Sequence, residues 1–372
     1  MAEVRIQGWC PTALRPMLAG DGLIVRIRPR LARLTPAQGQ GIALAALTHG
    51  NGLIDLSSRG NLQLRGIGEG SHPALLADLS ALGLIDPDQA TEARRNILVT
   101  PFWTKADGTA ELVDAIEKTM LQAADLPAKF GIVVDTGPVP VLAHSSGDIR
   151  IERKEGLILR PDGAAFGQRI TPETAAQAVL DLLNWFVATG GMARGRGRMV
   201  PHLGRAVLPG GFEVPAAAPA AVPVPGKHPL GFMVGFEFGQ IQAATFAALA
   251  IHPLRITPWR MILVAGAAEA CDIPGLITTP DDPRLRVSAC TGAPSCPQGL
   301  QPTRVLAARL AGAVPAGQHL HVAGCAKGCA HPGPADVTLT ATAQGFAVIR
   351  NGRASDASEA GYDAALSLFK AM

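Results

Sequence analysis

Two pairs of cysteines in the C-terminal part of the chain form its clearest chemical pattern. Cys290 and Cys296 lie in "CTGAPSCPQG", and Cys325 and Cys329 lie in "GCAKGCAHP", which gives C-x5-C, a gap of 28 residues and C-x3-C. Structural zinc sites usually use C-x2-C turns, whereas a [4Fe-4S] cube offers separate iron corners to four thiolates. The spacing therefore favours an iron–sulfur cluster held by all four cysteines.

The spacing alone leaves other uses of these thiols open. Zinc bound by wide loops, disulfides and buried thiols without a ligand role all fit it. We expect a cytoplasmic location, where disulfides are rare, because the start of the chain lacks a signal-peptide pattern and no window holds about 18 unbroken apolar residues. Cys10 and Cys271 are expected to be ordinary core or loop cysteines.

The composition indicates a globular protein and limits the classes of ligand that it is expected to bind. The chain has 372 residues, 48% hydrophobic and 17% charged, with a net charge of +3. Two or three domains are expected from this length. Aromatic residues make up only 4%, which is poor material for stacking nucleic-acid bases. The arginines are scattered in short clusters, so we expect a small polyanionic ligand, with no nucleic-acid or membrane partner.

A strand–helix–strand pattern occurs twice. In the first copy, residues 22–29 resemble a strand, a helix begins at Pro36 after the cap Thr35 and ends at Gly50, and residues 53–67 form a strand, turn and strand. In the second copy, residues 231–238, 239–252 and 253–266 repeat this order. Aligning Arg59 with Arg260 matches the apolar positions, which predicts two pseudo-symmetric halves with a cleft between them.

The remaining segments predict a mixed helix and strand protein. Residues 109–124 and 171–191 have the apolar spacing of helices, and 130–137 has the character of a strand. Residues 213–226, "EVPAAAPAAVPVPG", are rich in proline and alanine and are predicted to be a linker. The fold class is therefore α+β or mixed α/β.

Several stretches together resemble the nitrite and sulfite reductase superfamily. The resemblance rests on the cysteine pattern and on "LSSRGNLQLRG" (56–66), "RRNILVTPF" (94–102) and "LPAKFGIVVD" (126–135), in the order found in that superfamily. The N-terminal stretch 8–29 and the "AKG" of the second cysteine pair resemble its precorrin-3B synthase branch, which belongs to aerobic cobalamin (vitamin B12) biosynthesis.

The resemblance implies an α+β fold of two pseudo-symmetric halves, each with a ferredoxin-like half-domain and an α/β domain, and a [4Fe-4S] site in the C-terminal half. The expected domains are a first ferredoxin-like half-domain (1–70), a first α/β domain (71–212), the linker (213–226), a second half-domain (227–270) and a cluster-binding domain (271–372).

The resemblance also implies site residues. Cys329 matches the cysteine that bridges the cluster to the tetrapyrrole iron in siroheme enzymes. In reductases a second lysine usually stands at the position of Gly131, so this chain departs from the pattern of an oxyanion reductase. The residues that match tetrapyrrole-binding positions, as partners for carboxylates or for the ring, are Arg59, Asn61, Gln63, Arg65, Arg95, Asn96 and Lys129.

The implied activity is the O2-dependent hydroxylation of precorrin-3A at C20, with closure of a γ-lactone, fed by an external electron donor such as an NADH-linked reductase or a ferredoxin-like protein. A mononuclear non-haem iron is also implied, and we assign it no ligands, because a lone histidine is more often structural. The alternative is a siroheme-dependent nitrite or sulfite reductase. A non-catalytic electron carrier or cluster scaffold is a third class, although a carrier has no need of an arginine-lined cleft.

Overall fold

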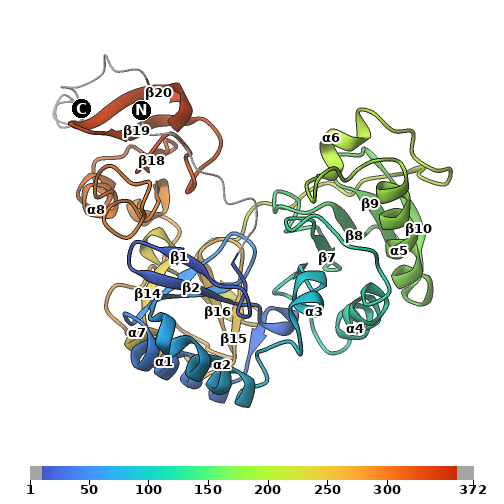
Figure 1. Cartoon of the computed structure of the whole chain (residues 1–372), viewed down its shortest axis with the longest axis horizontal. Helices are drawn as coiled ribbons and strands as arrows, with labels where there is room; N and C mark the ends of the chain where they lie inside the picture. The colour runs from blue at the N-terminus through green and yellow to red at the C-terminus, as the bar shows by residue number, and fades with distance from the viewer. Residues whose placement is uncertain (1–10, 358–372) are drawn as a thin grey trace.

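A computed structural model describes residues 11–357 of the chain. Within this range the backbone forms four β-sheets. Two of them, the first and second central sheets, lie together in the middle of the molecule (Figure 1). The α/β domain (residues 89–215, mainly green) lies to one side of them, and the cysteine domain (residues 283–356, orange to red) lies on another side.

The two central sheets exchange a strand. The first sheet has the order β1 (Met17–Ala19), β2 (Gly22–Ile27), β5 (Leu62–Ile67), β4 (Leu53–Leu56) and β14 (Gln240–Gln242). The second has the order β12 (Gly226–His228), β13 (Gly231–Gly235), β16 (Met261–Ala265), β15 (Leu254–Ile256) and β3 (Arg33–Leu34). Each sheet therefore takes its last strand from the other half of the chain.

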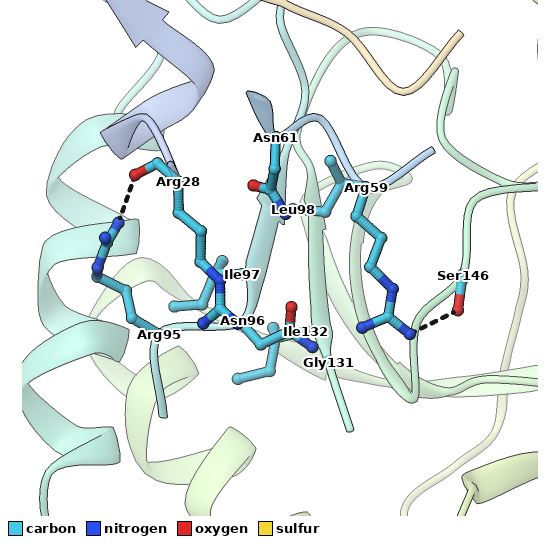
Figure 2. A pocket seen from close by; sticks show the side chains of 10 residues that line it. All are labelled: Arg28, Arg59, Asn61, Arg95, Asn96, Ile97, Leu98, Gly131, Ile132 and Ser146. Carbon is cyan, nitrogen blue, oxygen red and sulfur yellow. Dashed lines mark hydrogen bonds between the residues drawn. The ribbon is translucent and has the colours of Figure 1, made fainter. Parts of the chain in front are cut away.

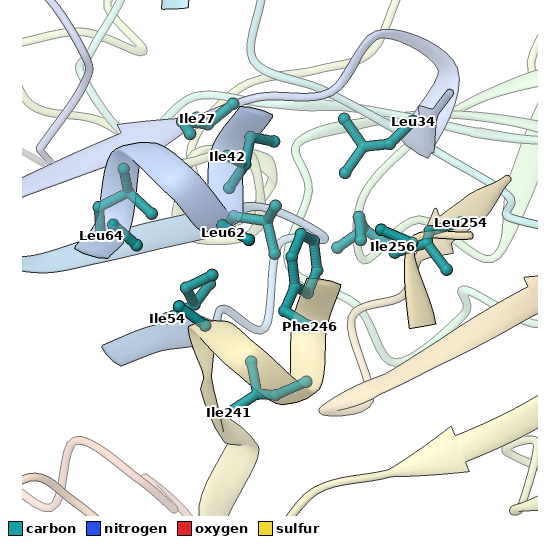
Figure 3. Close-up of a cluster of buried hydrophobic side chains, with 14 of the residues drawn as sticks. Ile27, Leu34, Ile42, Ile54, Leu62, Leu64, Ile241, Phe246, Leu254 and Ile256 are labelled. Atoms are coloured by element: carbon teal, nitrogen blue, oxygen red, sulfur yellow. The ribbon is translucent and has the colours of Figure 1, made fainter. Parts of the chain in front are cut away.

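Helices α1 (Pro36–His49), α2 (His72–Ala81) and α7 (Ala243–Leu249) cover these sheets. As predicted, α1 begins after Thr35, whose side chain accepts a hydrogen bond from the Gln38 backbone N–H while the Gln38 side chain bonds the Thr35 N–H. Figure 3 shows Ile42 of α1 and Phe246 of α7 in one cluster of buried side chains with strand residues of both halves. The two halves thus share one hydrophobic core, and the prediction of a cleft between the two copies was wrong, because their apolar faces pack on each other.

The predicted repeat is present, but its alignment was wrong by one residue. Ile54 pairs with Leu64 in the first sheet, and Leu254 pairs with Val264 in the second, so Leu254 is the counterpart of Ile54. The two turns have equal length, and Arg260 therefore matches Gly60, with φ angles of 60° and 64°. Because apolar side chains alternate on both copies, the sequence pattern alone did not fix the register.

The α/β domain contains a six-stranded sheet with helices packed on it. Its strand order is β11 (Val214–Pro215), β10 (Phe166–Ile170), β9 (Leu157–Pro161), β8 (Ile149–Arg153), β7 (Ile132–Asp135) and β6 (Ile97–Val99). Its helices are α3 (Gln89–Arg94), α4 (Thr109–Met120), α5 (Pro172–Ala188) and α6 (Met199–Leu203). Helices α4 and α5 end a few residues earlier than the apolar pattern predicted. No helix between residues 11 and 357 has both the length and the apolar character needed to cross a bilayer.

The cysteine domain repeats part of this topology. Strands β17 (Val287–Ala289), β18 (Leu320–Ala323) and β19 (Ala335–Thr342) are parallel, and β20 (Gly345–Gly352) is antiparallel to β19, with α8 (Arg304–Ala311) between β17 and β18. Strands β6 to β9 have the same directions, with α4 between β6 and β7. The predicted fold of two pseudo-symmetric halves is therefore confirmed.

Candidate functional site

The outward face of the first central sheet carries a set of polar side chains. Leu62 and Leu64 of β5 are buried in the shared core, so the alternate residues lie on the opposite face. Strand β2 pairs with β5 and follows the same alternation. The polar set, called here the polar face, consists of Arg26, Arg28, Asn61, Gln63 and Arg65, and Arg26 donates a hydrogen bond of 2.8 Å to Gln63.

A cleft lies between the polar face and the α/β domain. Figure 2 shows Arg28, Arg59 and Arg95 around it, with the amide side chains of Asn61 and Asn96. Its narrow part is almost filled by the side chains that line it. It adjoins a wider, open part, which Arg28 and Arg95 also line. A cleft with this many cations in its walls suits a ligand with several carboxylates.

Arg59 projects from the turn between β4 and β5 toward the α/β domain (Figure 2). Its guanidinium donates to the Lys129 carbonyl at 3.3 Å and to the Ser146 hydroxyl at 3.4 Å. Lys129 thus contributes its backbone here, while its exposed side chain is not among the groups that line the narrow cleft.

Arg95 and Arg28 lie on the other side of the narrow cleft (Figure 2). Arg95 forms a two-pronged ion pair with Asp86, with N–O distances of 2.8 Å, and also donates to the Arg28 carbonyl at 3.1 Å. Arg28 donates through Nη1 to the Glu92 carbonyl, and its buried Nε has no hydrogen-bond partner. Burial, and then the charge of Arg26, lower the pKa of Arg28 to about 10, so it is still protonated at neutral pH.

Asn96 lies against Gly131, the position at which the reductase pattern has a second lysine. Its side-chain amide donates to the Phe130 carbonyl at 2.6 Å. A Cβ atom on residue 131 would lie 2.9 Å from the Asn96 amide nitrogen. A lysine at this position would therefore displace Asn96 from the wall of the cleft.

Arg65 lies at the end of the polar face that is close to the cysteine domain. It pairs with Asp21 at 2.8 Å and with Asp55 at 3.5 Å, and it donates to the Ser295 carbonyl at 3.4 Å. The backbone N–H of Gly20 also donates to the Ser295 carbonyl, at 3.0 Å. The loop between Cys290 and Cys296 therefore rests directly against the polar face, and Arg65 has acidic partners within the protein.

The two cysteine loops leave the same edge of the cysteine-domain sheet. Cys290 directly follows β17, and Cys325 follows β18 closely. Because these neighbouring strands are parallel, their carboxyl ends meet at one edge. The Gly324 backbone N–H donates to the Cys290 sulfur at 3.1 Å. A Cβ on residue 324 would lie 3.0 Å from the Gly292 Cα, so the glycines allow the loops to approach closely.

Two of the four loop cysteines, Cys325 and Cys329, have raised pKa values. Burial first, and then the charges of Cys296 and Cys290, raise the pKa of Cys325. Burial is also the largest cause of the raised pKa of Cys329. The charges of the other three cysteines raise this pKa further, and the charge of Lys327 opposes them. Among residues 11–357, no group of three or more cysteine, histidine, aspartate or glutamate side chains has its ligating atoms placed as in a metal site. Four thiols in two adjoining loops are nonetheless the donor set that an iron–sulfur cluster requires.

Comparisons with known proteins match this geometry. The nitrite/sulfite reductase ferredoxin-like half domain matches residues 15–82. A precorrin-3B synthase of Sinorhizobium sp is 30% identical over 399 residues, which cover 94% of this chain and 84% of that protein. The chain belongs to the precorrin-3B synthase family. The structure of the Mycobacterium tuberculosis NirA protein has a TM-score of 0.63 at 19% identity, covers 88% of this chain and 74% of that chain, and supports the fold.

In this member of the precorrin-3B synthase family, the two pseudo-symmetric sheets have different outward faces. The face of the second sheet carries an apolar cluster, in which Met233, Met261 and Leu263 are buried beside Phe102 and Trp259. Arg255 pairs with Leu263 and with Arg33, so these two arginines lie on the same face as the cluster. Phe102 stacks on Trp259 with ring centroids 5.9 Å apart. Met261 and Leu263 therefore occupy the positions that Asn61 and Gln63 hold in the first sheet.

Sequence reasoning missed a group of histidines in the cysteine domain. His321 lies on β18 and His319 directly precedes this strand, and their rings are 5.7 and 4.8 Å from that of His331. Burial, followed by the charge of His331, lowers the pKa of both to about 4. Neither ring nitrogen of His321 has a hydrogen-bond partner. The H-x-H spacing of His319 and His321 is the sequence signal from which this group could have been predicted.

The other two cysteines differ from the four in the loops. Cys271 is half-buried and packs against the shared core, as expected for an ordinary core cysteine. Cys10 lies outside the described residues.

Proposed function

We propose that this protein catalyses the precorrin-3B synthase reaction, the O2-dependent hydroxylation of precorrin-3A at C20 with formation of a γ-lactone, with a [4Fe-4S] cluster held by Cys290, Cys296, Cys325 and Cys329. One oxygen atom of O2 enters the substrate, and the other leaves as water with two electrons and two protons. The family relationship and the layout of the cleft support this proposal.

The main support for the proposal is the contact between the polar face and one of the cysteine loops. The arginine-bearing polar face continues directly into the loop between Cys290 and Cys296, through the contacts of Gly20 and Arg65 with the Ser295 carbonyl. A ligand bound on the polar face therefore lies beside the cysteine loops. A redox group must be close to the molecule with which it exchanges electrons, and this arrangement meets that requirement.

The residues of the cleft would bind and orient the substrate. Precorrin-3A carries several carboxylate arms, and Arg28, Arg59 and Arg95 place guanidinium donors on both walls of the cleft. Asn61 and Asn96 add neutral polar groups between them. The existing ion pair between Arg95 and Asp86 holds that guanidinium in one orientation before binding.

The four cysteines would hold the cluster, which supplies single electrons when bound. Because the pKa values of Cys325 and Cys329 are raised, their thiols carry protons in the cluster-free protein. Cluster assembly must therefore release these protons, which makes uptake more favourable as the pH rises. The reducing equivalents would come from an external donor protein, in the cytoplasm.

The decisive experiment is anaerobic reconstitution with iron and sulfide, followed by precorrin-3A, a chemical reductant and O2. We expect a product heavier by one oxygen atom in mass spectrometry. Stable siroheme absorption bands with turnover of nitrite or sulfite would contradict the proposal and establish the reductase alternative. A loaded protein that binds no tetrapyrrole would instead indicate an electron carrier.

A further inference from the structure

Arg260 has an unusual backbone conformation for its residue type. It lies in the turn between β15 and β16 with φ 60°, in the left-handed region. Its counterpart in the first half is Gly60, which adopts this conformation without strain. An arginine is disfavoured there, and such a residue persists when its side chain makes contacts that offset the strain.

The side chain of Arg260 reaches out of the second central sheet into the cysteine domain. Its Nη1 donates to the Ser288 hydroxyl at 3.2 Å, and its Nη2 donates to the Ala330 carbonyl at 2.6 Å. Ser288 lies on β17, just before Cys290, and Ala330 directly follows Cys329. One guanidinium therefore joins the two chain segments that carry the first and the last cysteine of the pattern.

The surroundings of Arg260 are adapted to its course. Gly239 has φ 72°, and a Cβ on it would lie 2.9 Å from Arg260 Cγ, so only glycine leaves room for the arginine stem. Ser288 is buried and also shares a hydrogen bond of 3.0 Å with Nε2 of His319. The guanidinium therefore ends in a fixed polar network and is not a solvated surface charge.

We infer that Arg260 is a positioning residue for the cysteine site. It holds the segments of Cys290 and Cys329 at a fixed separation and places a positive charge beside the cluster. This inference rests on the proposed function, because it assumes that the four cysteines bind a cluster. It assigns a role at the cysteine site to a residue of the second central sheet's own hairpin.

The charge and the geometry of Arg260 have separate consequences. Reduction adds a negative charge to the cluster, and a nearby cation stabilises the reduced form, so removal of the cation lowers the reduction potential. The planar fork serves two acceptors at once, whereas a lysine ammonium is a single point donor. Loss of the fork therefore loosens the two segments even when the charge remains.

The test compares reconstituted wild-type protein with Arg260→Gln and Arg260→Lys. The measurements are the midpoint potential from a redox titration followed by electron paramagnetic resonance, and the rate of cluster loss to a chelator. We expect a lower potential and several-fold faster loss for Arg260→Gln. For Arg260→Lys we expect a potential close to that of the wild type, again with several-fold faster loss.

Arg255→Gln is the matched control, because Arg255 is on the neighbouring strand and its Nη1 donates to the carbonyls of Pro101 and Trp103. An equal shift in this control would overturn the inference, as would a wild-type potential and rate in Arg260→Gln. If Arg260→Gln does not fold, the rate at which Arg260→Lys loses its cluster to a chelator tests the inference instead. A rate equal to that of the wild type overturns the inference. A wild type that takes up no cluster would overturn the proposed function and this inference with it.

Discussion

The guanidinium groups around the cleft are held by the protein itself. Arg59 is bonded to the Lys129 carbonyl and to Ser146, and Arg95 is paired with Asp86. Such contacts restrict the long side chains before a ligand binds, which lowers the entropy lost on binding. The narrow cleft is also lined by the buried cation Arg28, so an anionic ligand gains from charges that water screens only weakly.

Arg59→Ala should weaken the binding of precorrin-3A by about 1.5–3 kcal/mol, the value expected for loss of a charge-assisted hydrogen bond. The measurement is an anaerobic equilibrium titration. Arg169→Ala is the control, because Arg169 is an exposed arginine bonded to the Glu155 carbonyl in the α/β domain. Equal affinities for the Arg59 variant and the wild type would show that Arg59 does not contact the substrate.

Cys329→Ser should abolish the electron paramagnetic resonance signal of the reduced cluster and lower the bound iron, because a four-thiolate site loses one ligand. Cys271→Ser removes a thiol that packs against the shared core and should leave both measurements unchanged. An unaltered spectrum in the Cys329 variant would refute the assignment of this ligand.

Among the secondary-structure elements, β18 and the residue before it carry two histidines that make the cysteine domain sensitive to acid. The pKa values of His319 and His321 are lowered from 6.5 to about 4, chiefly by burial. Below pH 6.5 the unfolded chain binds protons that the folded protein does not take up until about pH 4. The contribution of these histidines to the free energy of unfolding is therefore largest above pH 6.5 and decreases as the pH drops toward 4.

Urea unfolding of the cluster-free protein between pH 7.5 and 4.5 measures this effect. Each of the two histidines should contribute a slope of up to about 1.4 kcal/mol per pH unit within the window. His321→Phe should reduce the slope, and the same change at the exposed His144 is the control. A slope that is the same in wild type and His321→Phe would show that His321 does not resist protonation in the folded state.

At the scale of the whole molecule, Asp55 joins three parts of the chain. It lies on β4 and contacts Arg65 of the polar face, Gln240 of the exchanged strand β14 and Arg304 of α8, at 3.5, 2.9 and 3.4 Å. The contact with Arg304 links the cysteine domain to the first central sheet. This acid therefore helps to hold the cysteine loops against the polar face.

Asp55→Asn should lower the free energy of unfolding by about 1–3 kcal/mol, because it leaves buried donors without a charged partner. It should also speed limited proteolysis near the boundary of the cysteine domain. Asp114→Asn removes an exposed pair with Lys118 and should change stability by less than about 0.5 kcal/mol. Equal stability and proteolysis in the Asp55 variant and the wild type would exclude a docking role for Asp55.

The local features of this protein could be predicted from its sequence alone. The four-cysteine pattern, the alternation from Arg59 to Arg65 and the start of α1 at Thr35 depend on spacings within a few residues, and local backbone geometry converts such spacings directly into faces and caps. The tertiary structure decided the strand exchange between halves, the one-residue register of the repeat and the difference between the two outward sheet faces. It also brought Arg260 to both cysteine segments and His331 to the two histidines at β18. These features depend on pairing and packing between segments far apart in the chain, which no local pattern specifies.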